Sequence, residues 1–203
     1  MSEQGFTKRQ ITYLAFKRFL DIFIAFFAIV ILLPFLILVA LLILCTSRGP
    51  IFFLQRRVGR NNKVFRIIKF RTMRFDAPEI PPSNMTEEQQ KALLSNIGGF
   101  LRKTSIDELP QFFNIFVGQM SLIGPRPPAA INEDEIINER AKLFPSPNSL
   151  RPGLSGYAQT HGRNHEVKQK AELDYYYTKN ISFKLDIIIF FLTIRKMFLF
   201  EGR

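Results

Sequence analysis

The stretch from Ile22 to Cys45, IFIAFFAIVILLPFLILVALLILC, is a run of 24 residues without a charged side chain. A straight helix of that length is long enough to cross the hydrocarbon core of a bilayer, which takes about 20 residues. The run is too long for the apolar part of a cleavable signal peptide, and its end lacks a small-residue cleavage site. The sequence therefore predicts a membrane-associated helix.

Basic residues lie on both sides of this run. Lys17 and Arg18 come shortly before it, and residues 47–75 after it contain nine Lys and Arg but no Asp or Glu. Because the cytoplasmic flanks of membrane segments collect Lys and Arg, we expect both ends of the run on the cytoplasmic side.

Pro34 lies at the middle of the run. A proline there cannot donate to the Val30 carbonyl, and its ring opens that turn of the helix. The basic flanks and Pro34 together predict a re-entrant membrane helix over residues 1–46 that breaks at Pro34 and returns. A kinked helix that crosses the membrane once is the alternative, because proline is tolerated in membrane helices.

Composition limits the class of protein. Lys and Arg number 28 and Asp and Glu 17, which gives a formal charge of +11, and 47% of residues are hydrophobic. The apolar content excludes a disordered basic tail. A single Cys excludes an intramolecular disulfide framework and a Cys-rich zinc site. The charge predicts an anionic partner: nucleic acid, anionic lipid or a phosphorylated substrate.

Residues 47–203 are enough for a small cytoplasmic domain. We expect a helix-dominated α+β fold, with a hairpin over 51–73 and interfacial amphipathic helices, one of them at 182–200, under a small mixed domain. Further expected elements are helices over 109–117, 131–143 and 167–177, a rigid loop at 125–128 and a turn-rich segment at 145–162.

Two adjacent carboxylates, Asp107 and Glu108, follow a basic segment. One interpretation is a capping box, in which Ser105 and Glu108 begin the next helix. The other is a metal-assisted nucleophilic site, because a carboxylate can attack phosphorus and its neighbour can hold Mg²⁺. The two interpretations are compatible, since a helix N-terminus also attracts phosphate.

Several motifs then follow one another in a fixed order. They are Lys17-Arg18-Phe19-Leu20-Asp21, the run around Pro34, Gln55-Arg56-Arg57-Val58-Gly59, Lys69-Phe70-Arg71-Thr72-Met73, Ser105-Ile106-Asp107-Glu108-Leu109-Pro110-Gln111, Met120-Ser121-Leu122-Ile123-Gly124-Pro125-Arg126-Pro127, Arg151-Pro152-Gly153-Leu154-Ser155-Gly156 and Gly162-Arg163-Asn164. With this order and spacing, the chain from about Phe16 to its end resembles the monotopic phosphoglycosyl transferases of the bacterial sugar transferase family. We expect the minimal catalytic form, without the extra membrane-spanning region of larger relatives.

The resemblance implies a reaction and its chemistry. A UDP-sugar gives its sugar-1-phosphate to a membrane polyprenol (undecaprenyl) phosphate, and UMP is released. Asp107 is then the nucleophile that becomes phosphoglycosylated, and Glu108 is the Mg²⁺ ligand.

Substrate-binding positions also follow from the resemblance. Lys69, Arg102, Arg126 and Arg163 match cationic family positions, and Arg is suited to bidentate phosphate contacts. Pro125 and Pro127 restrict the backbone around Arg126. Asp174 matches an acidic position that orients a cation, with a salt bridge between helices as the alternative. Arg151 is open to a structural role in the Pro152-Gly153 turn.

The chain departs from the family pattern before Pro34, where Leu33 stands in place of a common Ser. A hydroxyl there would satisfy the carbonyl that Pro34 leaves free, and the run from Ile22 to Cys45 holds no side-chain oxygen. This departure puts the sharpness of the bend in question.

The main hypothesis is therefore an enzyme on the cytoplasmic face of the inner membrane, in the first membrane step of glycoconjugate or polysaccharide synthesis. Its expected partners are a UDP-sugar, polyprenol phosphate and anionic lipid, without nucleic acid, and a homo-oligomer is left open. The alternative is a non-enzymatic, membrane-anchored basic module that binds anionic lipid or nucleic acid through Arg56–Arg74. That module would not require Asp107 and Glu108.

Overall fold

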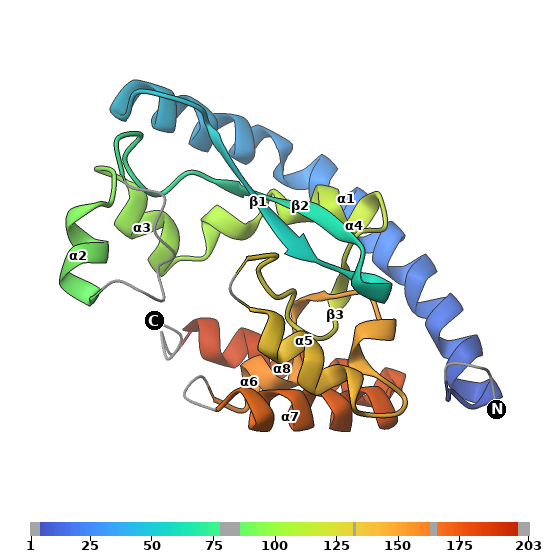
Figure 1. Cartoon of the computed structure of the whole chain (residues 1–203). Coiled ribbons are helices and arrows are strands. Elements are labelled where there is room, and N and C mark those ends of the chain that lie inside the picture. Colours follow the sequence, from blue (N-terminus) through green and yellow to red (C-terminus); the bar gives the residue numbers. More distant parts are fainter. Residues whose placement is uncertain (1–4, 78–85, 132, 163–165, 199–203) are drawn as a thin grey trace.

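The computed structural model describes residues 5–77, 86–131, 133–162 and 166–198. Helices dominate, and the named strands form two small two-stranded sheets, which confirms the helix-dominated α+β fold. Figure 1 shows one long helix, α1 (Lys8–Thr46), that passes from α7 and α8 near its start to the hairpin of β1 and β2 near its end.

The helix α1 begins at a capping box. The Thr7 hydroxyl accepts from the Gln10 backbone N–H, and the Gln10 side chain accepts from the Thr7 N–H in return. Among the described residues α1 is also the one helix long and apolar enough to cross a membrane.

The expected interruption of α1 at Pro34 is wrong, because the helix continues through this residue for 39 residues in all. Figure 1 shows α1 curving along its length without a gap. A proline removes a single helical hydrogen bond. Beyond it, Leu36, Val39 and Ile43 lie at helical spacing and are buried on one face of α1. Burial of this face holds the second half of α1 in helical register.

The chain after α1 forms the folded part, which is residues 47–198 where the structure describes them, and it packs against α1 on both sides of Pro34. Before Pro34, Ala25 is buried in a cluster with Ile115 and Met120. After it, Ile43 is buried in a cluster that includes Phe70. The opposite face of α1 leaves most of its large apolar side chains exposed. Exposed apolar surface of this extent marks an interaction with a membrane or a partner.

The predicted hairpin is confirmed. Strands β1 (Phe52–Val58) and β2 (Val64–Phe70) are antiparallel, with Val58 opposite Val64. The 3-10 turn η1 (Arg60–Asn62) joins them, and both Asn61 and Asn62 have positive φ, which asparagine tolerates better than most residues.

Short helices and turns make up most of the rest. They are α2 (Glu87–Ala92), α3 (Gly98–Lys103), η3 (Ile106–Glu108), α4 (Gln111–Phe116), α5 (Asp134–Ala141), η4 (Pro147–Ser149), α6 (Tyr157–Thr160), α7 (Val167–Lys179) and α8 (Phe183–Phe198). Helices therefore form inside each of the four segments after α1 that were predicted to be helical. The described part of α8 also exposes large apolar side chains, among them Phe183, Ile187 and Phe191.

A second, parallel sheet joins two motifs that the sequence leaves far apart. Strands β3 (Ser121–Ile123) and β4 (Gly153–Ser155) pair in parallel. Glycine permits this approach, because a Cβ on Gly153 would lie 2.1 Å from the Gly124 nitrogen. The sheet fixes the start of the 125–128 loop, which follows β3 directly.

A buried ionic contact ties α1 to α8. The Asp186 carboxylate accepts from Lys17 Nζ at 2.6 Å, from the Tyr13 hydroxyl at 2.6 Å and from the Tyr177 hydroxyl at 2.7 Å. The cation that neutralises Asp186 therefore comes from the motif Lys17-Arg18-Phe19-Leu20-Asp21.

Candidate active site

The acidic pair lies on a 3-10 turn and not inside an α-helix. Ser105 has φ 58°, in the left-handed region, and η3 then carries Asp107 and Glu108. A non-glycine residue in this region costs on the order of 1–3 kcal/mol, and such residues cluster at functional sites. Asp107 is buried, at 6% exposure, and Glu108 is half-buried.

The capping-box interpretation is wrong. The Ser105 side chain does not cap η3, and α4 begins only at Gln111, after Pro110. Helix capping therefore gives no account of why two carboxylates lie side by side here.

The strand β2 places a lysine against this pair. Lys69 Nζ donates to Glu108 Oε1 at 2.8 Å, with both side chains partly shielded from solvent. Arg102, near the end of α3, donates through Nε to the Thr72 hydroxyl at 2.9 Å. Thr72 lies two residues beyond the end of β2, so one strand and its extension hold Lys69 and orient Arg102.

The loop after β3 presents Arg126 to solvent. Pro125 and Pro127 are buried while Arg126 is exposed, so the flanking prolines fix the backbone and leave the guanidinium accessible. Its backbone is held from two sides. Arg57 donates to the Pro127 carbonyl at 3.0 Å, and Arg140 donates to the Arg126 carbonyl at 3.0 Å.

Asp174 lies beneath this loop. Its carboxylate accepts from Arg140 at 2.5 and 3.0 Å, and it is 1% exposed. Burial raises the pKa of Asp174, and the Arg140 guanidinium opposes that rise. The structure thus has the alternative that we considered for Asp174, a salt bridge between α5 and α7. Arg140 contacts Asp174 and also donates to the Arg126 carbonyl. Asp174 is therefore connected to the Arg126 loop through Arg140.

The charges of the loop and of the acidic pair are coupled through Arg57. Burial lowers the pKa of Arg57 and the positive charge of Arg126 lowers it further, while the negative charges of Glu133 and Glu108 act in the opposite direction. Arg57 therefore lies within electrostatic reach of both Arg126 and Glu108.

Two positioning residues, Arg57 and Arg140, were not assigned roles from the sequence. Arg57 belongs to the Gln55–Gly59 motif, so its place in that motif was a usable signal. Arg140 lies in a polar helix where an exposed charge is the ordinary expectation, and no sequence signal marks it. Arg163, the remaining predicted site residue, lies outside the described residues.

The donor set around Glu108 fits a metal that is shared with a substrate. In the described ranges, no group of three or more His, Cys, Asp or Glu side chains is placed to hold a metal. Mg²⁺ is commonly bound by one or two carboxylates together with water and substrate phosphates. The adjacent carboxylates of Glu108 and Asp107 match that kind of site.

Curated relatives resemble the chain over most of its length. It is 41% identical over 187 residues to "UDP-N-acetylgalactosamine-undecaprenyl-phosphate N-acetylgalactosaminephosphotransferase" of Aeromonas hydrophila, covering 90% of this chain and 44% of the relative. It is 34% identical to "UDP-glucose:undecaprenyl-phosphate glucose-1-phosphate transferase" of Klebsiella pneumoniae, covering 92% of this chain and 41% of the relative. The chain thus spans less than half the length of these two proteins.

A third relative is close to this chain in length. "Exopolysaccharide production protein PSS" of Rhizobium leguminosarum bv. phaseoli is 36% identical, over 89% of this chain and 94% of the relative. The family model described as "Bacterial sugar transferase" matches residues 12–200, which include every element of the candidate site. The chain belongs to the bacterial sugar transferase family.

Proposed function

We propose that this protein is a phosphoglycosyl transferase that moves sugar-1-phosphate from a UDP-sugar to polyprenol phosphate and releases UMP. The observation that carries the proposal is the buried carboxylate of Asp107 beside the Glu108–Lys69 ion pair, within the matched family region. The printed names of two relatives, which join a UDP-sugar to undecaprenyl phosphate, support the substrate classes.

In the proposed first step an oxygen of the Asp107 carboxylate attacks the β-phosphorus of the UDP-sugar. A bond forms between this oxygen and phosphorus, and the bond from phosphorus to the bridging oxygen breaks. UMP leaves with the bridging oxygen. In the second step a phosphate oxygen of polyprenol phosphate attacks the same phosphorus, and the Asp107 carboxylate is released. Covalent catalysis of this kind gives ping-pong kinetics.

Both reactants of the first step are anionic, so the site must offset their repulsion. Glu108 would hold Mg²⁺, with Asp107 beside it, and the bound metal would neutralise charge on the diphosphate. Lys69 supports the position of Glu108, and Arg126 is exposed on a fixed loop where a guanidinium can take a phosphate in bidentate fashion. We assign Arg102 and Arg163 to the same substrate by the family pattern.

The proposed setting is the cytoplasmic face of the membrane, with both ends of the unbroken helix α1 on that face and α8 in the interface. Burial of α1 against the folded part on both sides of Pro34 supports this. If α1 crossed the bilayer, about 30 Å of hydrocarbon would separate one of its ends from the domain, and that half could not pack against it. The exposed apolar faces of α1 and α8 then lie toward lipid, and the basic flanks favour the cytoplasmic side.

Release of UMP tests the proposal. The full chain in detergent is incubated with Mg²⁺, polyprenol phosphate and each of a panel of UDP-sugars. We expect UMP from at least one sugar, and loss of its release by about 10³-fold or more in Asp107→Asn and in Glu108→Gln. Asp134→Asn, an exposed acid on α5, is the control and should keep full activity. Retention of activity in either site variant would refute the assigned site.

A further inference from the structure

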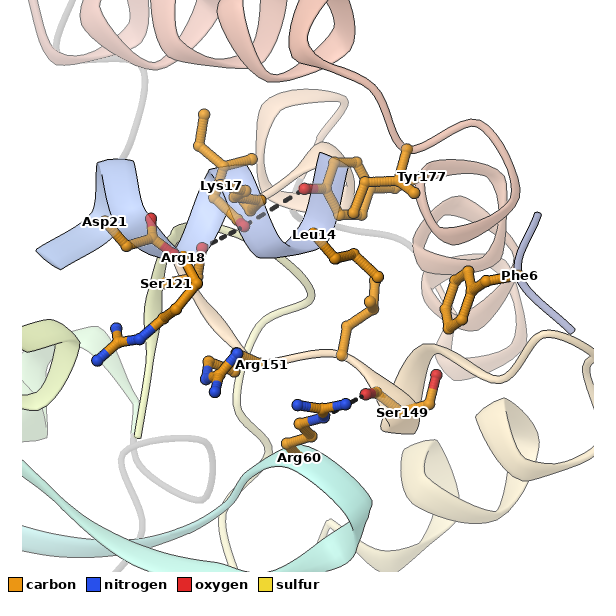
Figure 2. A pocket seen from close by; sticks show the side chains of 13 residues that line it. Phe6, Leu14, Lys17, Arg18, Asp21, Arg60, Ser121, Ser149, Arg151 and Tyr177 are labelled. Carbon is orange, nitrogen blue, oxygen red and sulfur yellow. Dashed lines mark hydrogen bonds between the residues drawn. The ribbon is translucent and has the colours of Figure 1, made fainter. Parts of the chain in front are cut away.

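A second group of cations lies around a pocket away from the acidic pair. Three arginines line it: Arg18 from α1, Arg60 from η1 and Arg151 just before β4. Figure 2 shows their guanidinium groups on the same side of the pocket. The residues that line this pocket include neither Asp107 nor Glu108, and none of the other predicted substrate-binding residues. The transfer reaction therefore assigns nothing to this pocket.

Backbone carbonyls hold all three guanidinium groups in place. Arg18 donates to the carbonyls of Ile115 and Phe116 at 2.7 and 2.9 Å. Arg151 Nε donates to the Gly118 carbonyl at 3.0 Å, and Arg60 Nε donates to the Ser149 carbonyl at 3.0 Å. A carbonyl orients a guanidinium without neutralising it, so each arginine keeps its full charge.

The negative charge in the pocket is smaller than the positive charge. Its lining includes the Asp21 carboxylate, which accepts from the Leu122 N–H at 3.0 Å. Lys17 also lines the pocket, but Asp186 neutralises it at 2.6 Å. In the described part of the chain, the three arginines form no ion pair within 4.0 Å of a carboxylate.

The mutual repulsion of these charges is visible at Arg151. Its pKa is lowered, first by burial and then by the positive charges of Arg60 and Arg18. A bound anion would relieve this repulsion, and a phosphate oxygen is a good acceptor for the fork of a guanidinium.

The arginines also lie at the edge of the exposed apolar surface. The turn that Arg18 and Arg151 hold carries Phe116 and Val117, which are 40% and 65% exposed. The ring of Phe116 lies 6.3 Å from that of Phe26 on α1. Apolar side chains such as Leu14 and Ile181 line another part of the pocket. A ligand with a charged head and an apolar tail fits this boundary.

We propose that Arg18, Arg60 and Arg151 form a second anion site, which binds the phosphate group of a membrane lipid at the edge of the apolar surface. The site requires no chemistry at Asp107, so it goes beyond the proposed transfer reaction. It would fix the depth and tilt of the folded part relative to the lipid phosphates.

Native mass spectrometry of the full chain in a neutral detergent tests this site. The probe is phosphatidylglycerol, titrated without UDP-sugar, so the result does not depend on the proposed transfer reaction. We expect Arg60→Gln and Arg151→Gln each to weaken binding about fivefold, since each removes one cation from the phosphate. Lys63→Gln is the matched control, because it removes one charge from the same hairpin turn outside the pocket, and it should change binding less than twofold.

Three results would overturn the proposal. Unchanged phosphatidylglycerol binding in both arginine variants would show that the arginines do not hold the lipid. An equal loss in Lys63→Gln would show that general surface charge is responsible. Displacement of the lipid by inorganic phosphate, with the same dependence on Arg60 and Arg151, would assign the site to a soluble phosphate. Arg60→Lys, which keeps the charge, should recover part of the affinity and so confirm that charge and not packing is measured.

Discussion

The carbonyl oxygens of Arg126 and Pro127 accept hydrogen bonds from two arginines that lie on different elements, Arg140 and Arg57. The loop therefore keeps its shape through backbone contacts in which the Arg126 side chain takes no part. An exposed guanidinium on a fixed backbone loses less conformational freedom when it binds a phosphate. At this scale the site depends on buried residues as much as on those that would touch substrate.

Removing Arg140 should destabilise the protein strongly. Arg140→Leu leaves the Asp174 carboxylate buried without its partner, which costs about 3–5 kcal/mol. The double variant Arg140→Leu/Asp174→Leu should recover much of that loss, because no buried charge remains. Thermal unfolding of four proteins in detergent (wild type, Arg140→Leu, Asp174→Leu and the double variant) measures this coupling.

The control for this experiment is Lys142→Met, in the neighbouring contact between Lys142 and Glu139. Lys142 is largely exposed, so this variant should change stability by less than about 1 kcal/mol. Additive losses in the double variant would contradict a coupled Arg140–Asp174 pair.

At the scale of elements, the parallel pair of β3 and β4 joins the motif that ends in Gly124-Pro125-Arg126-Pro127 to the motif that begins at Arg151. The sequence did not predict this sheet. Each strand has three residues, too few for a readable alternation, and about thirty residues separate them. The β1–β2 hairpin was predictable because β-prone pieces flank a turn with Gly59, Asn61 and Asn62.

Gly153→Ala should disturb this sheet and with it the Arg126 loop. The added Cβ would lie 2.1 Å from the Gly124 nitrogen, so backbone must move, at a cost of about 1–3 kcal/mol or more. We expect a lower unfolding temperature and weaker UDP-sugar binding. Gly99→Ala is the matched control: its Cβ meets nothing closer than 3.7 Å, and alanine favours the α3 helix. Equal unfolding temperatures for the two variants would contradict the packing argument.

Proximity of residues was predictable from the sequence where a motif carries its own chemistry, while the roles of those residues stay predictions. Lys69, Asp107 and Glu108 were predicted to share a site, and the structure brings Lys69 to Glu108. For Asp174 the sequence left two interpretations open, and it did not identify the partner, because Arg140 lies 34 positions away. The continuity of α1 through Pro34 was missed for the same reason, since the contacts of Leu36, Val39 and Ile43 come from distant segments.

At the scale of the whole molecule, the folded part lies along both halves of α1. The exposed apolar face of α1 is the face opposite this contact. This arrangement fits a protein that sits on one face of a membrane. The positive charge is distributed accordingly: a basic segment follows α1, Lys69 contacts Glu108 of the acidic pair, and three arginines line the pocket of Figure 2.

Cysteine labelling tests this topology. In a Cys45→Ser background, Lys8→Cys and Arg48→Cys place single thiols at the exposed start of α1 and just after its end. We expect a membrane-impermeant maleimide to label both in inverted vesicles and neither in intact protoplasts, because both ends are proposed to lie on the cytoplasmic side. Labelling of Lys8→Cys from outside would show that α1 crosses the membrane.

The central claim is that Asp107 becomes covalently attached to the sugar phosphate, and intact mass measures this directly. The wild-type chain, mixed with Mg²⁺ and the UDP-sugar that yields UMP but without polyprenol phosphate, should gain the mass of one sugar phosphate. Addition of polyprenol phosphate should remove it, and Asp107→Asn should never gain it. A wild-type chain that turns over without any mass gain, or an Asp107→Asn chain that gains it, would contradict the account.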